Sequence, residues 1–159
     1  MDSNRKLITD ITIGAIFAGI YVALTSLNPI GYGAIQFRFS EILLLFPFWH
    51  KKFIIPSVIA VGIANIFSPY GLLDVAVGVG IAIISYTLII KFKNKFVNIG
   101  LYSLLCGLLV GLELTYIEKT PFWFNFLSIT ASQLAIGLIG IYIINYLYNI
   151  AIIKTNWFE

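Results

Sequence analysis

The chain has 159 residues, of which 60% are apolar and only 11% are charged, whereas an ordinary globular chain carries about a quarter charged residues. This composition excludes a water-soluble surface, and with it a soluble catalytic or nucleotide-binding domain as the body of the chain. The net charge of +3 requires no nucleic-acid partner, because basic residues in short loops orient membrane helices. We therefore expect one integral membrane domain over residues 1–159, with the lipid bilayer as its solvent.

Long apolar segments indicate membrane-spanning helices, since about 20 helical residues cross about 30 Å of hydrocarbon. The first segment follows Arg5 and Lys6 and continues past Asp10 without an obvious small-residue cleavage site, so we expect a retained helix rather than a signal peptide. The segments that approach or reach this length lie near 8–27, 72–90, 97–117 and 126–150.

The region 40–70 can form one helix or two, because two apolar runs flank the sequence His50-Lys51-Lys52. A single helix would bury both lysines near the bilayer centre at about 2.5–3.5 kcal/mol each. Two short helices place the lysines at the turn and avoid that cost. The predicted fold is therefore an all-α bundle of six transmembrane helices near 8–27, 39–50, 53–67, 72–91, 97–117 and 126–151.

The basic residues predict the orientation of this bundle. With both termini in the cytoplasm, eight basic residues are cytoplasmic and two are external, as the positive-inside bias requires. A five-helix arrangement would export the cluster from Lys91 to Lys95. The cytoplasmic residues are Arg5, Lys6, Lys51, Lys52, Lys91, Lys93, Lys95 and Lys154, and the external ones are Arg38 and Lys119.

Polar residues converge on the external ends of the predicted helices. Ionisable groups at membrane depth usually face a bundle interior or a wet cavity, so their convergence predicts an outward-opening binding site. The acids outnumber the single arginine, which favours a neutral or cationic ligand, and aromatic side chains at the same level would stack on a flat ring. The polar set is Gln36, Arg38, Glu41, Asn65, Asp74, Glu113, Asn125 and Gln133; the aromatic set is Tyr32, Phe37, Phe39, Tyr70, Tyr116, Trp123 and Phe124.

Simpler interpretations of these residues stay open. Arg38 can pair with Glu41 three residues on, Asp74 can cap the helix near 72–91, and Trp123 can belong to an interfacial aromatic belt. The glycines at 31 and 33 give the first external loop freedom to act as a lid. No cofactor, metal or catalytic centre is expected, since the sequence has one His, one Cys and no metal-binding spacing.

Small residues recur at four-residue spacing in the first helix, as Ala15, Gly19 and Ala23. Such a stripe lets helices approach closely in lipid. It serves either internal packing or the docking of a partner subunit, and Gly107 and Gly111 repeat the pattern in the helix near 97–117.

The segment from Asn28 to Glu41, NPIGYGAIQFRFSE, resembles the QueT family, and the likeness continues through Asn65 and the turn Gly71-Leu72-Leu73-Asp74. Members are S components of energy-coupling factor (ECF) transporters linked to the uptake of queuosine precursors across a prokaryotic cell membrane. The resemblance implies a ligand such as 7-aminomethyl-7-deazaguanine or a related deazapurine. It also implies a transmembrane coupling subunit with two ATPase subunits, docked on the first helix. For direct ligand contact we expect Glu41 and Asp74 first and Glu113 next, with Gln36, Arg38, Asn65, Trp123 and Gln133 completing the site.

The sequence holds no Gly-x-x-x-x-Gly-Lys-Ser/Thr loop, so ATP hydrolysis would belong to the partner subunits and the chain is expected to be non-catalytic. An alternative is a self-sufficient, proton-coupled secondary transporter of a small cationic or neutral solute, because paired acids can carry protons.

Overall fold

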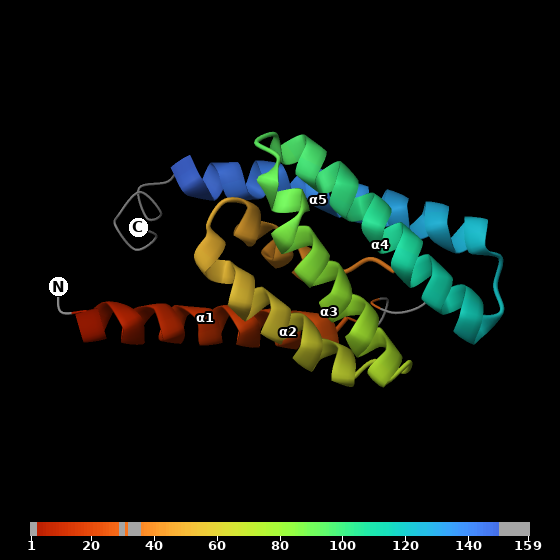
Figure 1. The fold of residues 1–159 in the computed structure, drawn as a ribbon, viewed down its shortest axis with the longest axis horizontal. Helices are drawn as coiled ribbons and strands as arrows, with labels where there is room; N and C mark the ends of the chain where they lie inside the picture. Colours follow the sequence, from red (N-terminus) through yellow and green to blue (C-terminus); the bar gives the residue numbers. More distant parts are fainter. Residues whose placement is uncertain (1–2, 29–30, 32–35, 150–159) are drawn as a thin grey trace.

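The computed structural model describes residues 3–28, 31 and 36–149, and within these ranges it contains only helical elements (Figure 1). This confirms the all-α prediction. Tyr32, Gly33, Lys154 and the last residues of the segment near 126–151 lie outside the described residues. The elements are α1 (Ser3–Ser26), η1 (Phe39–Phe48), η2 (Lys51–Phe53), α2 (Ile54–Ile66), α3 (Leu72–Thr87), η3 (Ile89–Lys91), α4 (Lys95–Glu118) and α5 (Phe122–Asn149), where η denotes a 3₁₀ helix.

Four of the helical segments are long and apolar enough to cross a membrane: Asn4–Ser26, Leu72–Lys91, Lys95–Glu118 and Phe122–Leu147. They match the four long apolar runs of the sequence. Large apolar side chains are exposed along each of them, among them Ile16, Leu88, Leu112 and Tyr142, and lipid would cover such a surface. The chain is therefore a multi-pass membrane protein.

The segment expected as a short α-helix near 39–50 is helical, but it is a 3₁₀ helix over Phe39–Phe48. Pro47 lies inside it, and a proline in an α-helix interior removes one hydrogen bond and clashes with the carbonyl four residues earlier. A 3₁₀ helix also rises about 2.0 Å per residue, so these ten residues span about 20 Å rather than about 15 Å. The 3₁₀ form thus makes this segment about 5 Å longer than an α-helix of the same ten residues.

The turn between η1 and α2 separates two helical segments, as expected, and it carries Lys51 and Lys52 in η2. Pro56 is the third residue of α2, where its missing N–H has no helical acceptor to lose. At the far end of the chain, α5 begins at Phe122, four residues before the expected start. The N–H groups of Phe124 and Asn125 donate to the carbonyl of Pro121 and extend the helix to that point.

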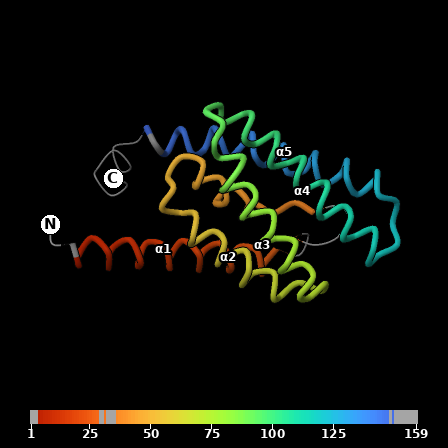
Figure 2. The backbone as a smooth tube through the Cα atoms, in the orientation of Figure 1, coloured from red at the N-terminus to blue at the C-terminus, as the bar shows by residue number. Residues whose placement is uncertain are grey.

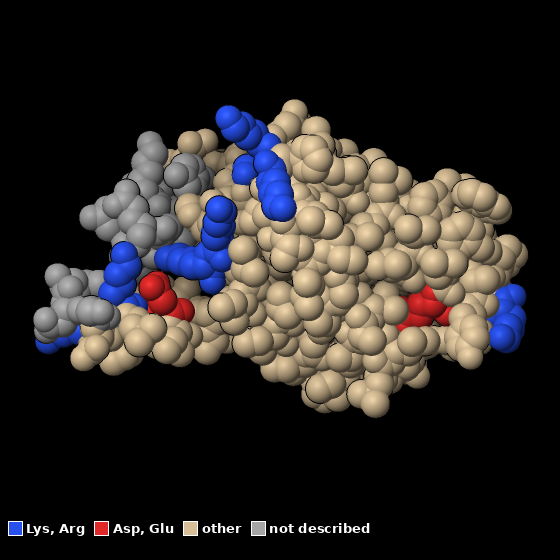
Figure 3. All heavy atoms as spheres, in the orientation of Figure 1, with Lys and Arg blue, Asp and Glu red and all other residues tan. Residues whose placement is uncertain are grey.

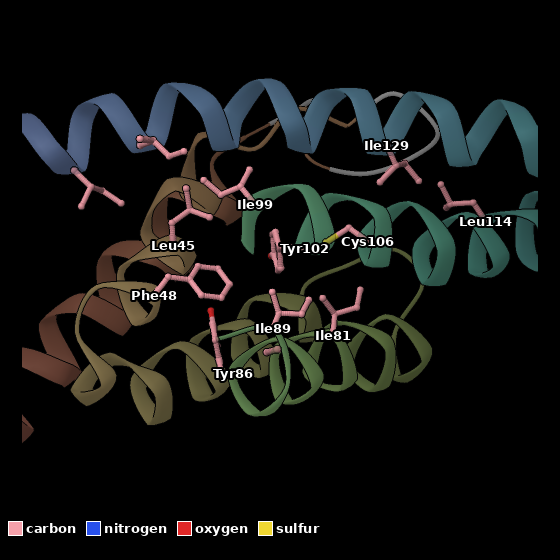
Figure 4. Packing of buried hydrophobic residues seen from close by; sticks show 13 residues of the cluster. Leu45, Phe48, Ile81, Tyr86, Ile89, Ile99, Tyr102, Cys106, Leu114 and Ile129 are labelled. Atoms are coloured by element: carbon pink, nitrogen blue, oxygen red, sulfur yellow. The ribbon is translucent and has the colours of Figure 1, made fainter. Parts of the chain in front are cut away.

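Helices α4 and α5 form a close pair. A Cβ atom at Gly107 would lie 1.9 Å from Thr130 Oγ1, and one at Gly111 would lie 3.3 Å from the backbone nitrogen of Phe126. These glycines are therefore what allows α4 to approach α5. The core between α3, α4, α5 and η1 is filled by Ile81, Tyr86, Tyr102, Ile129 and Leu45, among others, which point toward one another in Figure 4.

The beginning of α1 and the end of α5 lie toward the same end of the molecule (Figure 2). Positively charged side chains gather at that end (Figure 3). It carries the start of α1 and the connections from η1 to α2 and from α3 to α4. We call it the lysine end, and its described basic residues are Arg5, Lys6, Lys51, Lys52, Lys91, Lys93 and Lys95.

Candidate functional site

A partly enclosed cavity lies in the half of the bundle opposite the lysine end. Its walls come from α1, η1, α2, α3, α4, α5 and the segment before η1. The cavity is narrow, with a volume of about 40 Å³, which accommodates roughly two or three water molecules. A bicyclic ligand therefore requires its walls to move apart. The polar or titratable lining residues are Tyr21, Gln36, Arg38, Glu41, Asn65, Asp74, Tyr102, Cys106 and Gln133, and the apolar ones include Leu44, Val61, Ile81, Val110 and Ile129.

Two tyrosines hold the carboxyl group of Glu41, which lies in the first turn of η1 and is 5% exposed. Tyr21 of α1 donates its hydroxyl to Oε1 at 3.2 Å, and Tyr102 of α4 donates to Oε2 at 2.8 Å. Buried polar groups need such partners. Because each carboxylate oxygen can accept a second bond, Glu41 keeps acceptor capacity for a ligand while it ties three elements together.

Arg38, Asn65 and Asp74 form a second connected group. The Arg38 guanidinium donates through Nε to the carbonyl of Gly31 and through a terminal nitrogen to Asn65 Oδ1 at 3.4 Å. Asn65 in turn donates its Nδ2 to the backbone carbonyl of Asp74 at 2.9 Å. The end of α2 and the start of α3 are thereby fixed against the segment before η1.

Asp74 lies in the first turn of α3 and is 5% exposed, but it does not cap that helix. The N-cap is Gly71, with a φ of 64° that favours glycine, so the capping interpretation is wrong. The Asp74 Oδ2 atom is buried and has no hydrogen-bond partner in the part of the chain that the structure describes. An acceptor buried without a donor is costly, and here it belongs to a residue that lines the cavity.

Close packing at Gly78 of α3 completes this wall. A Cβ atom at this position would lie 2.2 Å from Asn65 Nδ2 and 2.9 Å from a Val61 methyl group. Only a glycine lets α3 approach α2 so that Asn65 reaches the carbonyl of Asp74.

Of the eight residues expected to bind substrate, the structure brings six to this cavity: Gln36, Arg38, Glu41, Asn65, Asp74 and Gln133. Glu113 is buried, and neither of its carboxyl oxygens has a hydrogen-bond partner within residues 3–28, 31 and 36–149, but it does not line the cavity. Trp123 is 70% exposed and also lies outside the lining, so its position fits an interfacial belt rather than the site. Asn125 bonds to Thr115 and Thr120 instead.

Tyr21, Tyr102 and Cys106 are site residues that the sequence argument missed. Each lies within a long apolar helix, Tyr21 in α1 and the other two in α4, where a phenol or a thiol is an ordinary core residue. The available signal was the phenolic hydroxyl, since a buried tyrosine usually needs a hydrogen-bond partner. This need predicts a buried acceptor near each tyrosine, and in the structure Glu41 accepts from both hydroxyl groups.

The small residues of α1 do not pack inside the bundle. Ala15, Gly19 and Ala23 are exposed, and a Cβ at Gly19 would meet nothing within 4 Å. They line a long apolar groove of about 790 Å³ between α1 and α2. The neighbouring Gly14, by contrast, contacts Pro56 of α2. One side of α1 therefore packs against α2, while the adjacent stripe of small residues is exposed.

Apolar spans around a narrow cavity lined by acids, an arginine and amides define a membrane protein equipped to receive a polar solute. The sequence comparisons agree with this class. The family described as QueT transporter matches residues 11–149. A relative from Lactococcus lactis subsp. cremoris (strain MG1363), named "Queuosine precursor transporter QueT", is 33% identical over 154 residues, which cover 86% of this chain and 90% of the relative.

The chain therefore belongs to the QueT transporter family, as the resemblance around Asn28 to Glu41 suggested. No solved structure matches it.

Proposed function

We propose that this chain is the substrate-binding S component of an ECF transporter, and that its cavity receives a queuosine precursor of the deazapurine class, such as 7-aminomethyl-7-deazaguanine. Membership of the QueT transporter family supports the substrate class. The observation that carries the proposal is the buried carboxyl oxygen of Asp74, which has no partner among the described residues and belongs to a cavity that Arg38 and Glu41 also line.

The chemistry of such a ligand complements this set of side chains. Its guanine-like edge presents two neighbouring N–H donors, which one carboxylate can accept together. Its carbonyl can accept from Arg38 or Gln36, and its aminomethyl ammonium group seeks a second acid. Asp74 has a free acceptor for the first role, and Glu41, already held by two tyrosines, is suited to the second.

In the proposed orientation the cavity opens to the exterior and the lysine end faces the cytoplasm, with six segments crossing the membrane of a prokaryotic cell. The gathering of basic side chains at the end where α1 begins and α5 ends supports this arrangement (Figure 3). Both termini are then cytoplasmic, and residues 1–159 act as one substrate-binding domain.

The chain itself is proposed to be non-catalytic, with ATP hydrolysis carried out by two partner subunits attached to a transmembrane coupling subunit. The exposed stripe of Ala15, Gly19 and Ala23 is the proposed docking face for that subunit. Only 17% of the α1 span is buried, against 50% of the α4 span. Helix α1 therefore has the most surface to offer a partner.

Ligand binding to the purified chain tests the proposal. We expect saturable binding of 7-aminomethyl-7-deazaguanine, and Asp74→Asn should weaken it about 10- to 100-fold, since hydrogen bonds to charged groups contribute about 1.5–3 kcal/mol. The control is Asp10→Asn, which removes a carboxylate from the partly exposed Lys52 pair at the other end and should leave affinity unchanged. Absence of saturable binding, with a known S component binding its own ligand under the same conditions, would refute the proposal.

Docking has a separate test in cells. Ala15→Trp and Gly19→Trp should abolish uptake while the purified variants still bind ligand, because the added rings fill the groove beside α2. Ile20→Trp is the matched control, since Ile20 is an exposed residue of the same helix outside the groove. If uptake persists with tryptophan at 15 and 19, this stripe is not the docking face.

One observation favours the alternative of a proton-coupled secondary transporter. Glu113 is a buried acid with no partner among the described residues, and such groups can carry protons. Liposomes containing the isolated chain distinguish the two functions: proton-dependent uptake without partner subunits would support the secondary transporter, and no uptake is expected of an S component.

A further inference from the structure

A second cavity lies at the lysine end, between the connection from η1 to α2 and the connection from α3 to α4. Its volume is about 350 Å³, and it is open on one side. Within the described part of the chain, no aspartate or glutamate lines it. The polar part of its lining is formed by Trp49, Lys51, Lys91, Lys93 and Lys95.

Among the residues that the structure describes, these four lysines have no acidic partner. None of them forms an ion pair with a described carboxylate, whereas Lys52, which lies outside the cavity, pairs with Asp10 at 3.8 Å. The Lys95 ammonium donates to the carbonyl of Phe48 and lies 5.4 Å from the centre of the Trp49 ring. The cavity thus concentrates positive charge beside an aromatic wall.

The helix ends increase the positive potential. Helix α4 begins with Lys95 and has no acid in its first turn, although the positive pole of a helix favours anions there. Partial burial, together with Lys52 and Lys95 nearby, lowers the pKa of His50 below its ordinary value, which is the effect expected where positive charge gathers. A bound anion would offset the charge that the protein leaves uncompensated.

The depth of the cavity identifies the source of such an anion. Lys91 ends one membrane span and Lys95 begins the next, so the cavity lies where the hydrocarbon meets the headgroups. Leu88, Phe92 and Phe96 beside it are more than half exposed, and they form an apolar surface for acyl chains.

We propose that this cavity binds the phosphate headgroup of an anionic phospholipid from the bilayer leaflet at the lysine end. The ammonium groups donate charge-assisted hydrogen bonds to the phosphate, and each lysine near the surface adds attraction to anionic lipid. The acyl chains lie on the exposed apolar residues of α3, η3 and α4. This site is independent of the proposed transport function.

The test compares lipid retention by purified wild type with that of Lys91→Gln/Lys93→Gln. Both lysines are exposed and donate no hydrogen bond within the described chain. Protein in a mixture of phosphatidylglycerol and phosphatidylcholine with the same acyl chains is analysed by native mass spectrometry. Wild type should retain phosphatidylglycerol preferentially, and the double variant should lose that preference by about fivefold per lysine. Arg5→Gln/Lys6→Gln removes the same charge from the same end and should keep it.

Three results would overturn the proposal: equal retention of the two lipids by wild type, an equal loss in the Arg5 and Lys6 control, or displacement of phosphatidylglycerol by millimolar inorganic phosphate, which would indicate a small-anion site. Thermal unfolding in zwitterionic detergent should be the same for wild type and variant. If the double variant is unfolded, the single substitutions at Lys91 and Lys93 provide the measurement.

Discussion

The two ends of the molecule differ in how far their charged side chains are buried. At the cavity end, Arg38, Glu41 and Asp74 are at most 7% exposed and line a shared space. At the lysine end, the basic side chains lie mostly at the surface, and the pair between Lys52 and Asp10 is partly solvated, with side-chain exposures of 24% and 40%. Buried ionisable groups within a membrane are expensive and mark function, whereas exposed lysines near headgroups cost little and set orientation.

The contrast extends to hydrogen bonding. Glu41 has a partner for each oxygen, from helices that are distant in the sequence, so its carboxyl group is part of the architecture as well as of the site. Among the described residues, Lys51, Lys91 and Lys93 at the other end have no such fixed carboxylate partner, which is the basis of the proposed lipid site.

Among substitutions that test this contrast between the two ends, Glu41→Leu is expected to have the largest effect, a fall in the free energy of unfolding. The change leaves the hydroxyl groups of Tyr21 and Tyr102 buried without their acceptor, at about 1–3 kcal/mol each, so we expect the free energy of unfolding to fall by about 2–6 kcal/mol. Unfolding in mixed detergent micelles, titrated with sodium dodecyl sulfate, measures it.

Glu113→Leu is the matched control for that change. Glu113 is equally buried, but its carboxyl group makes no hydrogen bond to any described residue, so its replacement should be neutral or stabilising. If both substitutions cost the same, the two tyrosine bonds do not explain the role of Glu41.

An intermediate effect is expected from Gly78→Ala, which introduces a methyl group where Asn65 Nδ2 lies. Asn65 then loses its bond to the carbonyl of Asp74, and ligand affinity should fall about tenfold, for one hydrogen bond in a desolvated site. Gly80→Ala, two residues on in the same helix, meets nothing within 4 Å and should leave affinity unchanged. Calorimetric titration of both variants decides, and equal affinities would show that Asn65 does not position the site.

The smallest change in the free energy of unfolding is expected from a substitution at the lysine end. Lys52→Gln breaks the 3.8 Å ion pair with Asp10. Because a partly exposed pair contributes about 0–1 kcal/mol, the free energy of unfolding should fall by no more than about 1 kcal/mol. A loss as large as that expected for Glu41→Leu would remove the distinction between the two ends.

The helical segments and the lysine turn could be predicted from the sequence, because hydropathy and the cost of burying charge act locally along the chain. Six of the eight expected ligand residues line one cavity. This convergence was predictable because polar side chains at one depth in a bilayer avoid lipid by facing the interior of the bundle. The 3₁₀ form of η1 was not predicted, because hydropathy shows where a helix crosses the bilayer but does not show the α-helical hydrogen bond that Pro47 removes.

Which stripe of small residues packs against another helix and which stays exposed could not be predicted either. Gly107 and Gly111 pack against α5, whereas Ala15 and Gly19 stay exposed, although both stripes have the same spacing. Which stripe meets a neighbour depends on tertiary arrangement. The pairing of Tyr21 and Tyr102 with Glu41 depends on it too, because these residues are 20 and 61 positions from Glu41 in the sequence.

The most direct measurement is an experimental structure of the chain with 7-aminomethyl-7-deazaguanine bound. The account predicts a widened cavity with the ligand ring inside it, and ring N–H groups about 2.7–3.2 Å from the Asp74 carboxylate. A ligand in the groove of α1, or one in the cavity with Asp74 and Glu41 turned away from it, would contradict the account.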